Sequence, residues 1–301
     1  MDSTLKTDSS TSKTLLDDWF HKGPKSDSGE ILVVGDYKAL EAVILGDIGI
    51  RLFGDDQVAQ MIAPGAPDIH CVNAQKIFGE YLGWTFEPDS AYPQLTGLRV
   101  DKTDWKTFKK HWYGKYLRFM IKAVWYGLSY GKSDYGFQTL EDVNGKMIGK
   151  ELAGKLVEGT KSAVPVMSKW HDYVADCVRR YGGIYTLGGR FLDVRELSQK
   201  DDWGFASACR KSDNFPAQGT GAEIINDALV RVYRHKGLKR IGFRTFIQVH
   251  DELGLRGPIE HAEKAVGFLR GCMDGATANG IKLLVQLQTS IGTGYDYYTA
   301  K

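Results

Sequence analysis

The stretch Gln248-Val-His-Asp-Glu-Leu253 decides the fold of this chain of 301 residues. Val249 and Leu253 alternate with polar neighbours, as on a half-buried strand, and glycines follow at positions 254 and 257. This pattern predicts a tight β-hairpin that carries His-Asp-Glu near its tip. Two adjacent carboxylates repel each other and need a cation, and oxygen ligands of this kind suit Mg²⁺ or Mn²⁺. Taken alone, the same three residues fit a solvated turn equally well.

The composition is that of an ordinary globular protein, with 43% hydrophobic and 25% charged residues. The chain is long enough for one large domain or two modest ones. Its net charge of +2 is no evidence for or against a polyanionic partner. Local charge is more informative, because residues 101–122 carry seven Lys or Arg against two Asp, and residues 231–244 carry six and no acid. Such runs are often only solvated faces, but these two flank the motifs described below.

Cysteine spacing and hydropathy indicate the compartment. The four cysteines lie far apart without CxxC spacing, which favours reduced thiols over disulfides or zinc. The sequence contains neither a signal peptide nor an apolar run of membrane-spanning length. We therefore expect a protein of a cytosol-like compartment, with no membrane partner.

Hydrophobic periodicity predicts a chain that mixes helices with antiparallel hairpins. Residues 1–30 are polar and are expected to form a tail, either flexible or partner-docking. Residues 85–105 are turn-rich, which predicts an irregular connection. The predicted strands are 31–34, which ends at Asp36, the two arms of a hairpin over 184–194, the hairpin around 248–253, and 281–287; the predicted helices are 40–48, 57–84 with a turn at 63–67, 105–126, 149–180, 218–234 and 259–278.

The helix predicted near the middle carries the most informative spacing. Arg118, Lys122, Tyr126 and Tyr130 fall four residues apart, which places them on nearly one face of a helix. Two cations and two rings in a line can hold a triphosphate at one end and stack a sugar or base at the other. An ordinary surface helix with aromatic packing explains the same spacing.

Taken together, these stretches resemble motifs A, B and C of the family A DNA polymerases. The matching segments are Asp36-Tyr-Lys-Ala-Leu-Glu41, Arg118-x3-Lys122-x3-Tyr126-Gly127-x2-Tyr130-Gly131 and Val249-His-Asp-Glu-Leu253. Their order fits, and smaller signatures agree, namely Asp68-Ile-His70, Arg210, Asn214-x-Pro216-x-Gln218-Gly-Thr220 and the closing stretch 283–295. The resemblance covers about residues 31–301.

The resemblance implies an α+β fold of the right-hand type. An antiparallel palm with helices would consist of residues 31–50 and 183–301, and helical fingers would consist of residues 51–182. The thumb is expected to be reduced or missing, and no exonuclease domain is recognisable. The resemblance therefore implies a split or minimal viral, phage-like enzyme of the bacterial or infected-host cytosol. In the split case, a second polypeptide that supplies either part is an expected partner.

The resemblance also implies the chemistry. Asp36, Asp251 and the Tyr37 carbonyl would bind two Mg²⁺ ions, which Mn²⁺ can replace, in a two-metal site. Glu252 would be a nearby acidic helper. Lys122 would protonate the departing pyrophosphate, and Lys122, Arg118 and His70 would bind the triphosphate.

The remaining site residues would contact the sugar, the base and the DNA. Tyr126 would pack on the incoming sugar, Tyr130 would stack beside the templating base, and Glu41 would crowd the 2′ position and so select deoxynucleotides. Four residues would follow the primer terminus: Arg210, Asn214, Gln218 and His250. The implied function is template-directed addition of dNTPs to a primer 3′ end in DNA replication, with primer-template DNA as partner. The alternative is a non-catalytic DNA-binding replisome subunit that retains the fold.

Overall fold

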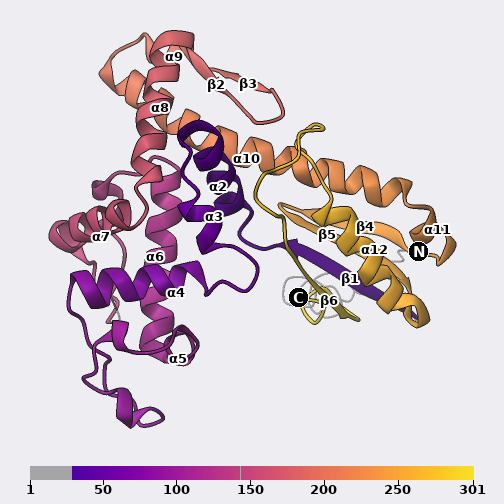
Figure 1. The fold of residues 1–301 in the computed structure, drawn as a ribbon, viewed down its shortest axis with the longest axis horizontal. Coiled ribbons are helices and arrows are strands. Elements are labelled where there is room, and N and C mark those ends of the chain that lie inside the picture. The colour runs from indigo at the N-terminus through magenta and orange to yellow at the C-terminus, as the bar shows by residue number, and fades with distance from the viewer. Residues whose placement is uncertain (1–28, 143) are drawn as a thin grey trace, which may run out of the picture. The chain divides into compact units, whose positions relative to one another are not determined.

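The computed structural model describes residues 29–142 and 144–301 and combines helices with antiparallel sheet, so the predicted fold class is confirmed (Figure 1). By its internal contacts the chain forms two compact units. The first contains the described residues up to 40 together with 221–282 and 286–301, and the second contains 41–220 and 283–285. None of the described helices is both long enough and apolar enough to cross a bilayer.

The first unit is built on a four-stranded sheet in the order β4-β5-β1-β6. β1 pairs antiparallel with β5 on one side and with β6 on the other, and β4 pairs antiparallel with β5. The strands are β1 (Glu30–Tyr37), β4 (Arg244–Val249), β5 (Glu252–Pro258) and β6 (Thr289–Gly294). The helices that lie wholly within this unit are α11 (Lys236–Arg240), the 3₁₀ turn η5 (Ile259–His261) and α12 (Ala262–Asp274).

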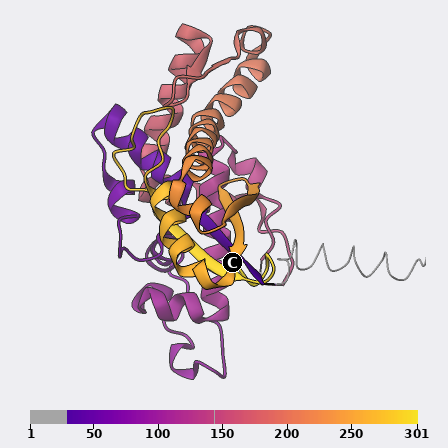
Figure 2. The same ribbon diagram turned by 90° about the vertical axis from the view of Figure 1, so that its right-hand side faces the viewer.

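β1 is one of the two inner strands of this sheet, and both of its faces are covered. α12 lies along one face, against β1 and β6 (Figure 2). A Cβ atom at Gly35 would lie 2.6 Å from Met273 Sδ, so the absence of a side chain at Gly35 lets this helix approach closely. On the other face, Leu32 and Val34 form a buried cluster with Ala300. The apolar run predicted at 31–34 is therefore a buried strand.

The second unit is mostly helical, with the two-stranded hairpin β2–β3 as its sheet. α6 (Trp112–Ser129) packs against α4, α5 and α7, and Leu117, Ile121 and Trp125 on its inner face are fully buried. The other elements are α2 (Leu40–Phe53, whose first residue belongs to the first unit), α3 (Gln57–Met61), α4 (Ile69–Ala74), the π-helix η1 (Gln75–Tyr81), η2 (Pro93–Leu95), η3 (Val100–Lys102), α5 (Trp105–Lys110), η4 (Asp134–Phe137), α7 (Gly149–Ala163), α8 (Val166–Tyr181), β2 (Gly183–Tyr185), β3 (Phe191–Asp193) and α9 (Arg195–Ser198).

Two helices predicted as continuous are each divided in two. The break between α5 and α6 falls at His111, whose Nδ1 accepts a hydrogen bond from Tyr113 N and so caps the second helix. The break between α7 and α8 falls at Val164 and Pro165, and a proline favours the start of a new helix.

One helix begins well before its predicted start at residue 218. α10 (Asp202–Arg234) runs through Pro216, which removes one backbone hydrogen bond from its interior. The same helix contributes to both units, because the boundary falls between residues 220 and 221. The boundaries of these compact units fall at residues 40 and 220, and the palm and fingers boundaries at residues 50 and 183 stay a prediction.

The strand predicted over 281–287 is wrong. Leu283, Val285 and Leu287 are buried, so the apolar alternation is real. Leu284 N, however, donates to the Asp47 carboxylate at 2.6 Å, and the chain joins the sheet only later, as β6. Alternation of apolar and polar residues indicates which side chains are buried, but it does not show which groups the backbone forms hydrogen bonds with.

The close approach of β6 to the segment 295–301 gives a stability test. A Cβ atom at Gly292 would clash with the backbone carbonyl of Ala300, whereas one at Gly271, on α12, would meet no atom within 4 Å. We expect Gly292→Ala to lower the free energy of unfolding by about 1–3 kcal/mol. Gly271→Ala is expected to leave it unchanged or raise it by up to about 1 kcal/mol. Chemical denaturation measures both, and equal effects would contradict the packing described.

Candidate active site

The pairing of β1 with β5 brings together two carboxylate motifs that lie far apart in the sequence. In this register Asp36 lies directly opposite Glu252. Tyr37 N donates to the backbone carbonyl of Asp251 at 3.4 Å, so the end of β1 is joined to the hairpin turn itself. The predicted meeting of Asp36 with the His-Asp-Glu stretch is therefore present in the backbone.

The turn that carries Asp251 has an unusual backbone. Val249 and Glu252 pair across it, which leaves His250 and Asp251 as its two central residues. His250 has a φ of 51°, in the left-handed region that such hairpin turns require and that glycine occupies most easily. Gln248 Nε2 donates to the His250 carbonyl at 3.0 Å and supports this conformation. A positive φ on a residue other than glycine is a form of local strain that occurs often at functional sites.

Tyr37 anchors the end of β1 from the opposite face of the sheet. Its hydroxyl donates to the Met273 carbonyl in α12 at 2.7 Å, and its ring is buried. Burial raises the pKa of this phenol, with the nearby Asp274 adding to the effect, so the hydroxyl stays protonated. The side chain thus holds the backbone of residues 36 and 37 in place.

Glu252 is already engaged within the first unit. One of its carboxylate oxygens accepts a hydrogen bond from the Tyr297 hydroxyl, and the other pairs with the Lys301 ammonium. In the part of the chain that the structure describes, no three His, Cys, Asp or Glu side chains are grouped so that they could hold a metal ion.

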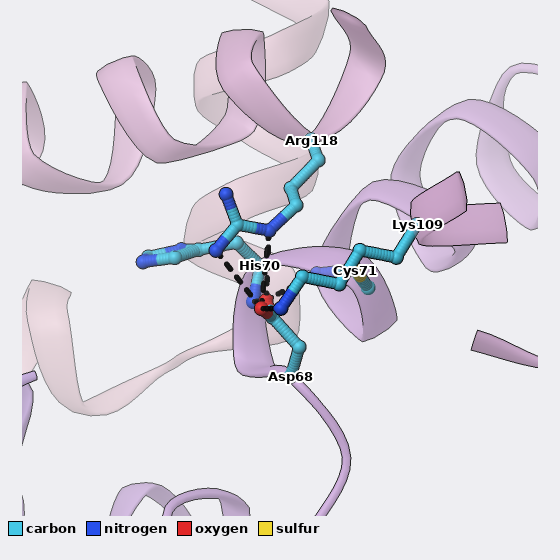
Figure 3. Close-up of polar contacts among 5 residues, drawn as sticks. All are labelled: Asp68, His70, Cys71, Lys109 and Arg118. Carbon is cyan, nitrogen blue, oxygen red and sulfur yellow. Dashed lines mark hydrogen bonds and ion pairs between the residues drawn. The ribbon is translucent and has the colours of Figure 1, made fainter. Parts of the chain in front are cut away.

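A second group of predicted residues gathers in the helical unit around Asp68 (Figure 3). Arg118 donates to the Asp68 carboxylate through Nε at 3.1 Å and through Nη2 at 2.9 Å, and Lys109 Nζ lies 2.9 Å from the same carboxylate. Asp68 also caps α4, because its Oδ1 accepts from the backbone N–H groups of His70 and Cys71. Burial alone would raise the pKa of Asp68, but these cations outweigh it and hold the pKa well below its ordinary value.

His70 is a neutral side chain at this position. Burial lowers its pKa to about 4, and the positive charges of Arg118 and Lys122 add to the shift, while Asp68 opposes it. Its Nδ1 is buried and has no hydrogen-bond partner among the described residues. His70, which the sequence predicts to bind phosphate, therefore has a buried nitrogen that can form a hydrogen bond with a bound molecule.

The predicted line along α6 is present. The His70 and Tyr126 rings are 5.6 Å apart, Tyr126 and Tyr130 stack at 6.5 Å, and Lys122 Nζ lies 5.7 Å from the Tyr126 ring. Tyr130 lies just after the last helical turn, and its hydroxyl donates to Glu41 Oε1 at 2.9 Å. Two motifs, one at the start of α2 and one at the end of α6, thus meet in one contact.

The predicted DNA contacts are divided between the units. Arg210, Asn214 and Gln218 lie four residues apart on α10, in the part that belongs to the second unit. His250 is exposed at the hairpin turn of the first unit. The structure thus places Asp36, Tyr37, His250, Asp251 and Glu252 in the first unit and the other predicted site residues in the second.

Sequence reasoning assigned no role to four residues that contact predicted site residues, two in each unit. Asp68 was detectable, because an aspartate directly before a helix is a typical N-cap. The other three, Lys109, Tyr297 and Lys301, reach their partners only through tertiary structure, and no local pattern indicates them.

Comparison with known proteins bears on the same motifs. The family model for DNA polymerase family A matches residues 102–299. The chain is 27% identical to the thermostable DNA polymerase I of Thermus thermophilus and to the DNA polymerase I of Chloroflexus aurantiacus. These matches cover 92% and 89% of this chain but only 28% and 24% of the relatives, so the chain spans about a quarter of their length.

A solved structure has the same fold. It is the POL domain of Pol1 from M. smegmatis in complex with DNA primer-template and dNTP, with a TM-score of 0.70 and 24% sequence identity. The match covers 92% of this chain and 41% of that one. With motif order, sheet register and family model in agreement, the chain belongs to DNA polymerase family A.

Proposed function

We propose that this chain catalyses template-directed addition of deoxynucleotides to a primer 3′ end, in DNA replication. The observation that carries the proposal is the β1–β5 register, which joins Asp36 to the turn at Asp251. The line of cations and rings on α6 supports it from the second unit. The related M. smegmatis structure, which contains primer-template and dNTP, supports the same substrates.

The residues at the end of β1 fit divalent cations. Asp36 and Asp251 supply carboxylate oxygens and Tyr37 a backbone carbonyl, which are the ligands that Mg²⁺ prefers, and Mn²⁺ accepts the same set. Mg²⁺ is commonly held by one or two carboxylates together with substrate phosphates, so a site with few protein ligands is adequate. When bound, a pair of such ions lowers the pKa of the primer hydroxyl and offsets the charge of the triphosphate.

The cluster around Asp68 fits the triphosphate. Arg118 uses Nε and Nη2 to bind Asp68, so its Nη1 edge remains directed away from that pair and suits a phosphate oxygen. His70 is neutral and contributes a hydrogen bond without charge. Lys122 would add a positive charge and donate a proton to the departing pyrophosphate.

The contact between Tyr130 and Glu41 fits sugar selection. A carboxylate held at 2.9 Å by the phenol has a fixed orientation, which suits a side chain that must exclude a 2′-hydroxyl. We propose that Glu41 performs this exclusion, that Tyr126 packs on the sugar and that Tyr130 lies beside the templating base. Arg210, Asn214, Gln218 and His250 are proposed to contact the DNA.

The biological setting is also a proposal. We propose a minimal viral enzyme that acts in the bacterial or infected-host cytosol. A second polypeptide that supplies a thumb or an exonuclease has no support in the comparisons. The alternative, a non-catalytic replisome subunit, predicts DNA binding without primer extension, so extension by the purified chain separates the two.

The carboxylate pair gives the first functional prediction. Asp36→Asn or Asp251→Asn removes one negative charge from the proposed cation site. We expect primer extension to fall by about 10²–10³-fold with the melting temperature nearly unchanged. Asp134→Asn, at an exposed carboxylate, is the control and should extend normally. Near-normal extension by either site variant would refute the assignment.

The phenol of Tyr126 gives the second. A dideoxynucleotide lacks the 3′-hydroxyl, and a tyrosine hydroxyl can replace its hydrogen bond whereas phenylalanine cannot. We expect Tyr126→Phe to raise the preference for dNTP over ddNTP, as a ratio of kcat/KM, by about two- to tenfold. Tyr181→Phe, at an exposed ring, should leave the ratio unchanged. An unchanged ratio in Tyr126→Phe would show that its hydroxyl does not reach the sugar.

The Tyr130–Glu41 hydrogen bond gives the third. Tyr130→Phe frees the Glu41 carboxylate, and Glu41→Ala removes it. Both are expected to increase ribonucleotide incorporation, Glu41→Ala more strongly, and Tyr130→Phe by about two- to tenfold. A competition assay between rNTP and dNTP measures this, with the exposed Tyr135→Phe as control. Unaltered selectivity in Glu41→Ala would place the exclusion elsewhere.

A further inference from the structure

Glu252 creates an electrostatic problem in the first unit. It lies directly opposite Asp36 on the neighbouring strand and follows Asp251 in sequence. Like charges at directly opposed positions of an antiparallel pair destabilise it. A third carboxylate beside the proposed cation site would also change how many oxygen ligands surround the ion. Something must therefore offset the charge of Glu252.

Two side chains from the segment 295–301 bind this carboxylate, and one of them, Lys301, is a cation. Both carboxylate oxygens of Glu252 have partners, since Tyr297 donates to Oε2 and the Lys301 ammonium pairs with Oε1. Lys301 Nζ also lies 4.5 Å from the centre of the Tyr297 ring, which adds a cation–π contact. The Glu252 side chain is only 16% exposed, whereas that of Lys301 is 45% exposed, so water shields this ion pair mainly from the lysine side.

The segment that carries these two residues is itself held in place. Ala300 is fully buried and packs in the cluster with Leu32 and Val34. Between the two partners of Glu252, Thr299 N donates to Asp296 Oδ1 at 2.7 Å and Ala300 N to the Asp296 carbonyl at 3.1 Å, which closes a turn. The clamp on Glu252 is thus supported by the same face of the sheet that carries Asp36.

We propose that Tyr297 and Lys301 are positioning residues that retain the Glu252 carboxylate and offset its charge, so that Asp36 and Asp251 form the divalent-cation site without it. This inference rests on the proposed function, because it concerns the cation site of that reaction. It implies that Glu252 binds the segment 297–301 and not the cation, and that Lys301 therefore affects how tightly the cation binds. Removing the Lys301 charge releases Glu252, which then becomes a third carboxylate for the ion.

The test is Mn²⁺ binding to the full chain without DNA or nucleotide, followed by electron paramagnetic resonance. We expect Lys301→Met to tighten Mn²⁺ binding by about fivefold, the order expected for one additional charge near a protein surface. Lys301→Arg should restore the wild-type Kd. The matched control is Lys264→Met, which removes an exposed charge from α12 in the same unit.

The double variant Lys301→Met with Glu252→Gln identifies the cause. If released Glu252 is responsible, the Kd of the double variant returns to that of Glu252→Gln alone. Persistence of the tighter binding in the Glu252→Gln background, or an equal change in Lys264→Met, would overturn the proposal. So would Mn²⁺ binding that survives Asp36→Asn unchanged.

Folding and function are separated by two further measurements. Tyr297→Phe removes only a hydroxyl, so it keeps the test usable if Lys301→Met does not fold, and a smaller shift in the same direction is expected. Primer extension by the wild-type chain is measured independently. If the chain does not extend primers but Lys301 still controls Mn²⁺ binding through Glu252, the proposed function fails and this inference stands. If the chain extends primers and Lys301→Met binds Mn²⁺ as wild type does, the inference fails alone.

Discussion

The register between β1 and β5 is the constraint on which the candidate site depends. Because side chains alternate along a strand, a slip of one residue would turn Asp36 to the α12 face and Gly35 to the other. Two features prevent such a slip. Gly35 lacks a side chain and so lets α12 pack closely at that position, and the Tyr37 hydroxyl donates to the Met273 carbonyl on the same face. The contacts of Gly35 and Tyr37 with α12 lie on one face of the sheet, and they fix the position of the carboxylates on the opposite face.

In the helical unit, the site residues are positioned by α6, a helix with one buried face. Apolar residues on the inner face of α6 hold this helix in place. The four-residue spacing on its other face therefore fixes the order of Arg118, Lys122 and Tyr126 in space. Its ends are joined to other motifs by polar contacts, Arg118 to Asp68 and Tyr130 to Glu41. Each of these contacts links segments that are at least fifty residues apart in sequence.

The parts of the fold and of the candidate site that depend on local sequence patterns were predictable from the sequence. Alternation around Val249 and Leu253 indicated the hairpin, and four-residue spacing indicated the outer face of α6. The failures have physical causes. Leu283 to Leu287 alternate because they are buried, but Asp47 takes the backbone bond that a strand would make. The partners of Glu252 were not predicted, because Tyr297 and Lys301 are 45 and 49 residues away in sequence and belong to no recognisable sequence motif.

Asp68 performs three tasks with one carboxylate: it begins α4, orients Arg118 and binds Lys109. These tasks place opposing demands on the side chain. Asparagine, serine or threonine would keep the cap but lose the charge, whereas glutamate would keep the charge and lose the short reach that capping needs. Only aspartate meets both demands, so this position has no conservative replacement. A substitution at Asp68 therefore disturbs the start of α4 and the orientation of Arg118 at the same time.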